Sequence, residues 1–217
     1  AEDGMPARTQ VVRMTDTTDT GPAIAPGPPA MTYYPSAELS RLPEDVRERI
    51  LAVQEKSGFI PNVFLALAHR PEEFRAFFAY HDAVMLRDSR LTKAEKEMIV
   101  VATSAANDCT YCVISHGAIL RIHARDPYIA DQVAIHYHTA GLTARQIAML
   151  DFAVKLARAP ETVDPEDRAR LVEQGFSAED IWDIGAITAL FALSNRMAHL
   201  TGMRPNDDFY LLGRIAR

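Results

Sequence analysis

Apolar side chains recur at helical spacing along most of the chain after residue 42. Val46, Ile50 and Val53 follow the run Pro43-Glu44-Asp45, and the pattern stops at Gly58. Proline and acidic residues favour the first turn of a helix, and glycine favours the position after its last turn, so these residues predict a helix. No segment alternates apolar and polar residues as a half-buried strand does. The sequence therefore predicts an all-α protein.

Further helices are predicted from residues that cap a helix start. A hydroxyl or carboxylate followed three residues later by an acid or amide can satisfy two free backbone amides reciprocally. Proline in the first turn gives a similar signal because its fixed backbone angle suits that position. The predicted starts lie at Pro71, Thr92, Thr143, Asp164 and Ser177.

Two of the predicted helices, at 98–106 and 181–193, are apolar almost all round. Such a helix belongs inside a domain or in an interface between subunits. We expect Trp182 and the aromatic group Phe74, Phe77 and Phe78 in the core. The two helices open in the same register, which indicates a weak internal repeat whose second copy has no cysteine. The matched positions are Thr92, Glu95, Ile99 and Thr103 in the first copy, and Ser177, Asp180, Ile184 and Thr188 in the second.

The first 42 residues differ from the rest of the chain. Residues 1–43 hold seven of the thirteen prolines, together with Gly21-Pro22 and Gly27-Pro28-Pro29. This composition predicts a Pro-rich extended N-terminal arm at 1–42 and an all-helical domain at 43–217.

Composition narrows the class of protein. Hydrophobic residues make up 48% of the 217 residues, which suffices for an ordinary core, and the net charge is −6. The acidic balance argues against a nucleic-acid surface. No apolar run approaches the ~20 residues that cross a bilayer, and no secretory signal is visible, so we expect a cytoplasmic protein with no membrane partner.

The candidate site combines the two cysteines with a histidine and a glutamate. Cys109, Cys112 and His116 are spaced i, i+3 and i+7, so they share one face of a predicted helix that begins near Cys109. The start of a helix favours thiolate over thiol, and an imidazole one turn from Cys112 can take its proton. Glu97 lies in an otherwise apolar helix and needs a buried partner, which His116 would supply.

Other interpretations of these residues remain open. The cysteines can be a buried structural pair, because cysteine is among the most buried residue types. Cys109, Cys112, His116 and Glu97 also have the side chains that bind zinc, although three of them crowd onto one helical face. Glu97 can instead pair on the surface with Lys93, one turn away.

The spacing from Glu97 to Cys109-Thr-Tyr-Cys112 and His116 resembles the signature of the alkylhydroperoxidase D family, within the carboxymuconolactone decarboxylase-like superfamily. The chain is most similar to its bacterial peroxidase-related branch, over roughly residues 43–210. Supporting stretches are 57–63, 69–71, 140–143, 191–196 and Gly202.

The resemblance implies an all-helical homo-oligomer, a dimer, trimer or hexamer, that reduces organic hydroperoxides. It implies that Cys112 attacks the peroxide and Cys109 resolves it to a disulfide, with Glu97 and His116 as a proton relay. An external dithiol would be the electron donor, and no cofactor or metal is expected. The chain departs from the founding members at Tyr111, where they carry a histidine between the cysteines.

Two other functions compete with a peroxidase. One is an enzyme that uses His116 and Glu97 as an acid/base pair on a small organic acid or lactone. The other is a non-enzymatic redox sensor, or an oligomer stabilised by metal, in which Cys109 and Cys112 are structural.

Overall fold

The computed structural model describes residues 30–214 of the chain. The expected arm at 1–42 therefore lies mostly outside the described residues. Regular structure from 30 to 214 is helical throughout, with no strand, which confirms the all-α prediction. None of the helices in this range has the length and apolarity to span a membrane.

Ten α-helices and four short helical turns make up the described chain. The turns are three 3₁₀ turns at Leu39–Arg41, Tyr137–Thr139 and Pro160–Thr162, and a π-helical turn at Asp82–Leu86. The helices are α1 (Glu44–Ser57), α2 (Asn62–Leu67), α3 (Pro71–His81), α4 (Lys93–Ala106), α5 (Thr110–Ala124), α6 (Ile129–His136), α7 (Ala144–Arg158), α8 (Pro165–Glu173), α9 (Ala178–Thr201) and α10 (Asp208–Leu211).

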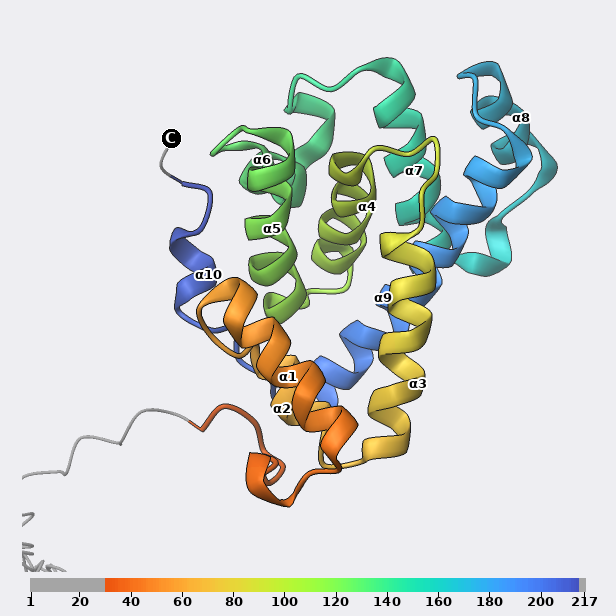
Figure 1. Cartoon of the computed structure of the whole chain (residues 1–217). Helices are drawn as coiled ribbons and strands as arrows, with labels where there is room; N and C mark the ends of the chain where they lie inside the picture. The colour runs from red at the N-terminus through yellow and green to blue at the C-terminus, as the bar shows by residue number, and fades with distance from the viewer. Residues whose placement is uncertain (1–29, 215–217) are drawn as a thin grey trace, which may run out of the picture.

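Helix α4 is the centre of the molecule. It packs against α5, α6, α7 and α9, and all its residues from Glu95 to Ser104 are buried (Figure 1). Helices α1, α2 and α3 form a smaller group at one end, around an apolar cluster that includes Val46, Phe74 and Phe78. The expected core position of Phe74 and Phe78 is confirmed, and Phe77 is half-buried against the same cluster.

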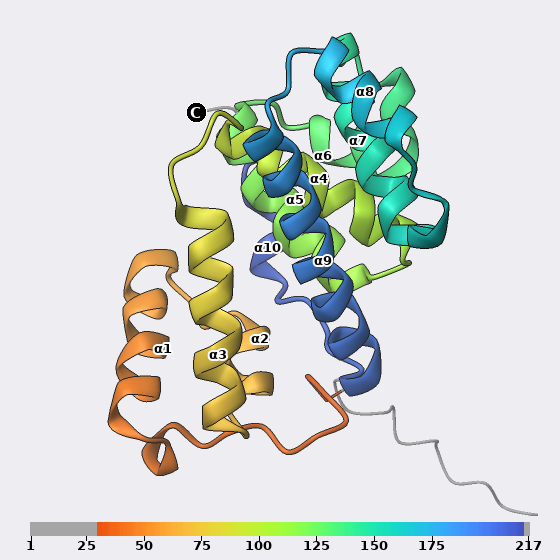
Figure 2. The same cartoon turned by 90° about the vertical axis from the view of Figure 1, so that its right-hand side faces the viewer.

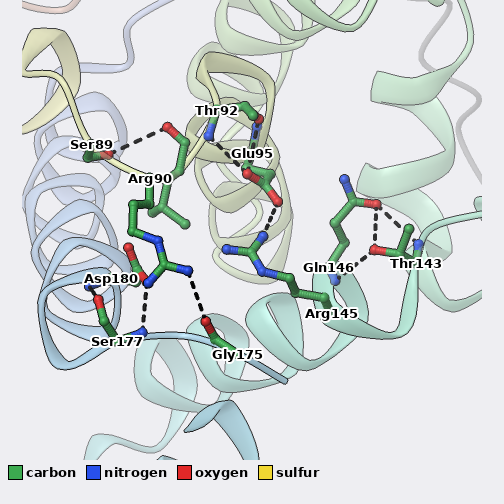
Figure 3. Close-up of polar contacts among 11 residues, drawn as sticks. Ser89, Arg90, Thr92, Glu95, Thr143, Arg145, Gln146, Gly175, Ser177 and Asp180 are labelled. Atoms are coloured by element: carbon green, nitrogen blue, oxygen red, sulfur yellow. Dashed lines mark hydrogen bonds and ion pairs between the residues drawn. The ribbon is translucent and has the colours of Figure 1, made fainter. Parts of the chain in front are cut away.

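The starts of α4 and α9 have the same construction. Thr92 and Glu95 form a complete capping box on α4, and Ser177 and Asp180 form one on α9, as predicted. Figure 3 shows that each box is braced by an arginine from another segment. Arg145 of α7 donates to Glu95 over 2.5 Å, and Arg90, which precedes α4, reaches Asp180 over 3.2 Å and the Gly175 carbonyl.

The matched register continues one turn further into both helices. Thr103 donates its hydroxyl to the Ile99 carbonyl over 2.7 Å, and Thr188 donates to the Ile184 carbonyl over 2.8 Å. All four residues are buried. The two copies of the predicted repeat therefore share a cap, a buried isoleucine and a buried threonine.

One expectation for α9 is wrong. Trp182 is 74% exposed, because α9 lies at the side of the bundle (Figure 2). The helix runs to Thr201 and closes on Gly202 at φ 61°. Leu193 and Leu200 are also exposed on α9. The homo-oligomer that the resemblance implied stays a prediction.

A short N-terminal strap, defined here as residues 31–34, lies against the end of α9. The Tyr33 amide donates to the Thr201 carbonyl over 2.7 Å, and the Arg204 amide donates to the Met31 carbonyl over 3.0 Å. The buried Thr32 hydroxyl donates to the same Thr201 carbonyl. Figure 2 shows the start of the described chain meeting the end of α9.

The π-helical turn after α3 is fixed by a buried lysine of α4. Lys96 Nζ donates to the carbonyls of Val84, Met85 and Arg87 over 3.2, 3.3 and 2.7 Å. A π turn leaves carbonyls without their usual helical partners, and the ammonium group satisfies them. The end of α3 is thereby held beside the residue that follows Lys96, which is Glu97.

Candidate active site

The two cysteines lie at the turn of the hairpin formed by α4 and α5. Asp108 adopts a left-handed conformation at φ 53°, and the Cys109 amide donates to the Ser104 carbonyl over 2.9 Å. Cys109 is the residue that precedes α5, instead of lying inside its first turn as expected, and Cys112 is the third residue of the helix. Unpaired amides and the positive end of the helix dipole therefore lie beside both sulfurs.

The two thiols are buried and influence each other. Cys109 is 2% exposed and Cys112 is 1% exposed. A hydrogen bond from Cys112 lowers the pKa of Cys109 to about 6, against the opposing effect of burial. The same contact, together with burial, raises the pKa of Cys112 well above its usual value. The pair therefore loses one proton readily and holds the second, so a thiolate and a thiol coexist at neutral pH.

Glu97 and His116 form the expected pair. His116 Nδ1 lies 2.7 Å from Glu97 Oε2, and the side chains are 15% and 9% exposed. The His116 ring meets the Phe191 ring edge to face at 4.6 Å. The carboxylate fixes the orientation of the ring and leaves Nε2 as the nitrogen for chemistry. Glu97 makes no contact with Lys93, so the surface-pair interpretation is wrong.

Helix α9 supplies a second set of polar contacts to the cysteines. Ser194 Oγ lies 3.7 Å from Cys112 Sγ. Asn195 is 1% exposed, donates to Ser104 Oγ over 3.0 Å and accepts from Asn107 Nδ2 over 2.9 Å. Asn195 also lowers the pKa of both thiols through hydrogen bonding. Spacing along the sequence did not predict this role for Ser194 or Asn195.

Tyr111, between the cysteines, ties α5 to α2. Its side chain is 5% exposed, and its hydroxyl accepts the Val63 amide over 3.1 Å. Burial raises the pKa of this phenol above its usual value. At neutral pH the group is therefore an uncharged structural contact between α5 and α2.

Two histidines that had no visible partner in the sequence lie near the site. His81 Nδ1 lies 3.1 Å from Asp82, and the charges of His116 and Glu97 both act on the pKa of His81, which burial lowers. His199 Nε2 lies 2.9 Å from the Asn107 carbonyl, and its charge lowers the pKa of Cys109. Neither histidine could be assigned to the site from its position in the sequence. The π turn after α3 and the length of α9 place them there.

The zinc interpretation gains no support from this geometry. Among residues 30–214, no three histidine, cysteine, aspartate or glutamate side chains converge as metal ligands. Cys109 and Cys112 are free thiols in the structure.

Comparison with known proteins identifies the family to which the chain belongs. Residues 71–155 match the model of the carboxymuconolactone decarboxylase family. A structure described as an alkylhydroperoxidase AhpD core, an uncharacterized peroxidase-related protein from Ralstonia eutropha JMP134, is 61% identical. It has a TM-score of 0.86 and covers 88% of this chain and 100% of its own. No curated protein matches the chain.

Two further solved structures are similar to this chain at lower sequence identity. An uncharacterized peroxidase-related protein from Silicibacter sp. TM1040 is 39% identical, with a TM-score of 0.81 over 86% of this chain and 98% of its own. The debrominase Bmp8 is 21% identical, with a TM-score of 0.68 over 84% of this chain and 95% of its own, and shares the fold alone.

These matches define the class as the carboxymuconolactone decarboxylase-like superfamily of helical proteins. Within it, the chain belongs to the alkylhydroperoxidase D-like, peroxidase-related proteins.

Proposed function

We propose that the protein is a thiol-dependent peroxidase that reduces organic hydroperoxides and is regenerated by an external dithiol. The observation that carries this proposal is the 2.7 Å contact between Glu97 and His116, next to a buried CxxC pair at a helix start. A carboxylate, an imidazole and an activated thiol are the groups that thiol-based peroxide reduction needs.

The proposed cycle begins with a proton transfer. His116, oriented by Glu97, draws the proton from Cys112, and the thiolate attacks one oxygen of the O–O bond. The bond breaks, Cys112 becomes a sulfenic acid, and the leaving alkoxide takes a proton to become the alcohol. Cys109 thiolate then attacks the sulfenic sulfur, so that a disulfide forms and water leaves. An external dithiol reverses the disulfide by exchange and is itself oxidised.

Attack by Cys112 requires the proton to shift between the two thiols. Cys109 carries the thiolate first, since its pKa is about 6. Cys112 donates to it, so the proton can pass from Cys112 to Cys109 as well as to His116. Cys112 then carries the negative charge, and the pair of thiols has still lost only one proton in total.

The test compares hydroperoxide consumption by the wild type, Cys112→Ser and Cys109→Ser, with excess dithiol. We expect no turnover without Cys112, and about one equivalent of peroxide consumed without Cys109, because the sulfenic acid then has no resolving thiol. Thiols that survive peroxide in the wild type would contradict the proposal and leave Glu97 and His116 as an acid/base pair for another substrate.

The pH dependence gives a second measurement. Because the pKa of Cys109 is lowered to about 6, the thiolate is present above that pH and absent well below it. The rate of alkylation of Cys109 by iodoacetamide should therefore rise with a midpoint near pH 6 in the wild type, and the midpoint should move to higher pH in Cys112→Ala, which removes the hydrogen bond from Cys112. A midpoint at the ordinary thiol value in the wild type would rule out the paired-thiol description.

A further inference from the structure

A pocket of about 400 Å³ opens beside Cys109 and leaves Cys112 out of its lining. Its walls come from the strap, the start of α5, the end of α9 and the segment that leads into α10. Cys109 is recessed in it, at 2% exposure, while Cys112 lies behind Cys109 against Ser194. The two sulfurs of the CxxC pair therefore differ in access.

The wall formed by the strap is fixed in position. Tyr33 lines the pocket, and its ring lies over Gly202, where a Cβ atom would be only 2.4 Å away. The hydrogen bonds of Thr32 and Tyr33 to the Thr201 carbonyl hold it there. Glycine at position 202 suits the left-handed end of α9, and its missing side chain leaves room for the exposed Tyr33 ring.

The pocket suits a small molecule in size and in chemistry. Its volume lies in the range of ligand sites, ~300–1,000 Å³. His199 and Asp108 bring polar groups to it, and Tyr33, Met203 and Tyr210 bring apolar surface. A folded protein that presents a cysteine on a flat surface would not reach a sulfur at this depth, whereas a low-molecular-weight thiol would.

We propose that this pocket is the entry site for a low-molecular-weight thiol, which opens the Cys109–Cys112 disulfide by attack on Cys109. The inference rests on the proposed disulfide cycle. The incoming thiolate forms a bond to Cys109 Sγ, the bond between the two sulfurs breaks, and Cys112 leaves as a thiolate that takes a proton from protonated His116. A second thiol then attacks the mixed disulfide, releases Cys109 as a thiolate, and leaves as part of a disulfide.

Thr110→Trp tests the entry route. Thr110 is an exposed pocket residue at the first position of α5, so a larger side chain there narrows the pocket without entering the core. The protein disulfide is formed with diamide, which needs no peroxide, and its reduction by dithiothreitol is followed by acid quench and mass. We expect reduction to slow at least ~10-fold, because thiol exchange depends on access to the attacked sulfur.

Two controls separate a blocked pocket from a damaged helix. His123→Trp adds the same side chain at an exposed position near the other end of α5, and its disulfide should be reduced at the wild-type rate. The oxidation of reduced Thr110→Trp by peroxide should also keep its rate. An unchanged rate of disulfide reduction in Thr110→Trp would overturn the proposal. So would an equal slowing of its disulfide reduction and of its oxidation by peroxide.

The attacked sulfur is identified directly. The oxidised protein is mixed with excess 2-mercaptoethanol, quenched early, and mapped by peptide mass spectrometry. We expect the adduct on Cys109, and an adduct on Cys112 would overturn the proposal. If peroxide fails to form the disulfide but the diamide-formed disulfide reacts in this way, the peroxidase function fails and the entry site stands.

Discussion

Helices α4 and α9 begin with the same kind of capping box but differ in the residue that follows two positions after its acid. Both start with a capping box and carry a buried isoleucine and threonine at matching positions. Where α4 places the buried carboxylate of Glu97, α9 places Trp182, which is 74% exposed. The comparison shows that the cap and the threonine recur in both helices, whereas the residue two positions after the cap's acid is the partner of His116 in one helix and an exposed tryptophan in the other.

The largest effect on peroxide turnover should come from Glu97, the position at which the two copies of the repeat differ most. Glu97→Gln keeps the shape but removes the charge that orients His116 and makes it basic, so we expect peroxide turnover to fall about 100-fold. Trp182→Phe, at the matching position, should leave turnover unchanged. A Glu97→Gln enzyme with wild-type turnover would remove Glu97 from the proposed relay.

The next effect concerns the acids of the two capping boxes. Glu95 and Asp180 are both buried, but Arg145 at Glu95 is 29% exposed and Arg90 at Asp180 is 65% exposed. Arg145 also lies 3.9 Å from the centre of the Phe176 ring. Glu95→Gln should therefore lower the free energy of unfolding by about 2 kcal/mol, and Asp180→Asn by about 1 kcal/mol.

Urea denaturation of the two variants gives this comparison. The m-value should stay constant, since the folded surface is the same. Equal losses would show that the exposure of the arginine does not matter.

The hydroxyls of the two caps should have smaller and equal effects. Thr92→Ala and Ser177→Ala each remove the acceptor for one amide at a helix start, which costs about 1 kcal/mol. Urea denaturation of both variants measures the loss. A much greater loss of stability in one variant than in the other would show that the starts of α4 and α9 are not equivalent.

The smallest effect is expected at the matched threonines. Thr103 and Thr188 donate to carbonyls of their own helices that already have helical partners. Replacement of either by valine keeps the shape and leaves no acceptor without a donor, so the free energy of unfolding should change by less than about 1 kcal/mol. Thermal melting of both variants tests whether the change is equally small.

The sequence predicted the parts of this molecule that depend on neighbours along the chain. Capping boxes, helix ends at glycine and the contact between Glu97 and His116 all follow from local spacing. Trp182 was misplaced, because apolar periodicity does not reveal which helix lies at the outside of a bundle. The place of Asn195 in the site was also not predicted, because its amide bonds to Ser104 of α4, which lies far away in the sequence.

The site also contains residues that no local pattern could assign. His81 reaches the relay through the π turn that Lys96 stabilises, and His199 reaches Cys109 from the end of a 24-residue helix. The pocket wall at Tyr33 depends on a contact with Thr201. Such partners lie far apart in sequence, and only the packing of the helices brings them together.

The strap has a consequence for the order in which the molecule folds. Glu97, both cysteines and His116 lie within one hairpin, whereas the bond from Thr32 to Thr201 joins residues 169 positions apart. Local contacts form early and long loops close late, so the reactive thiols should be in place before the wall of their pocket. Amides of the strap should accordingly exchange with deuterium much faster than those of α4, and a nascent chain would have an open thiol site until its last helix arrives.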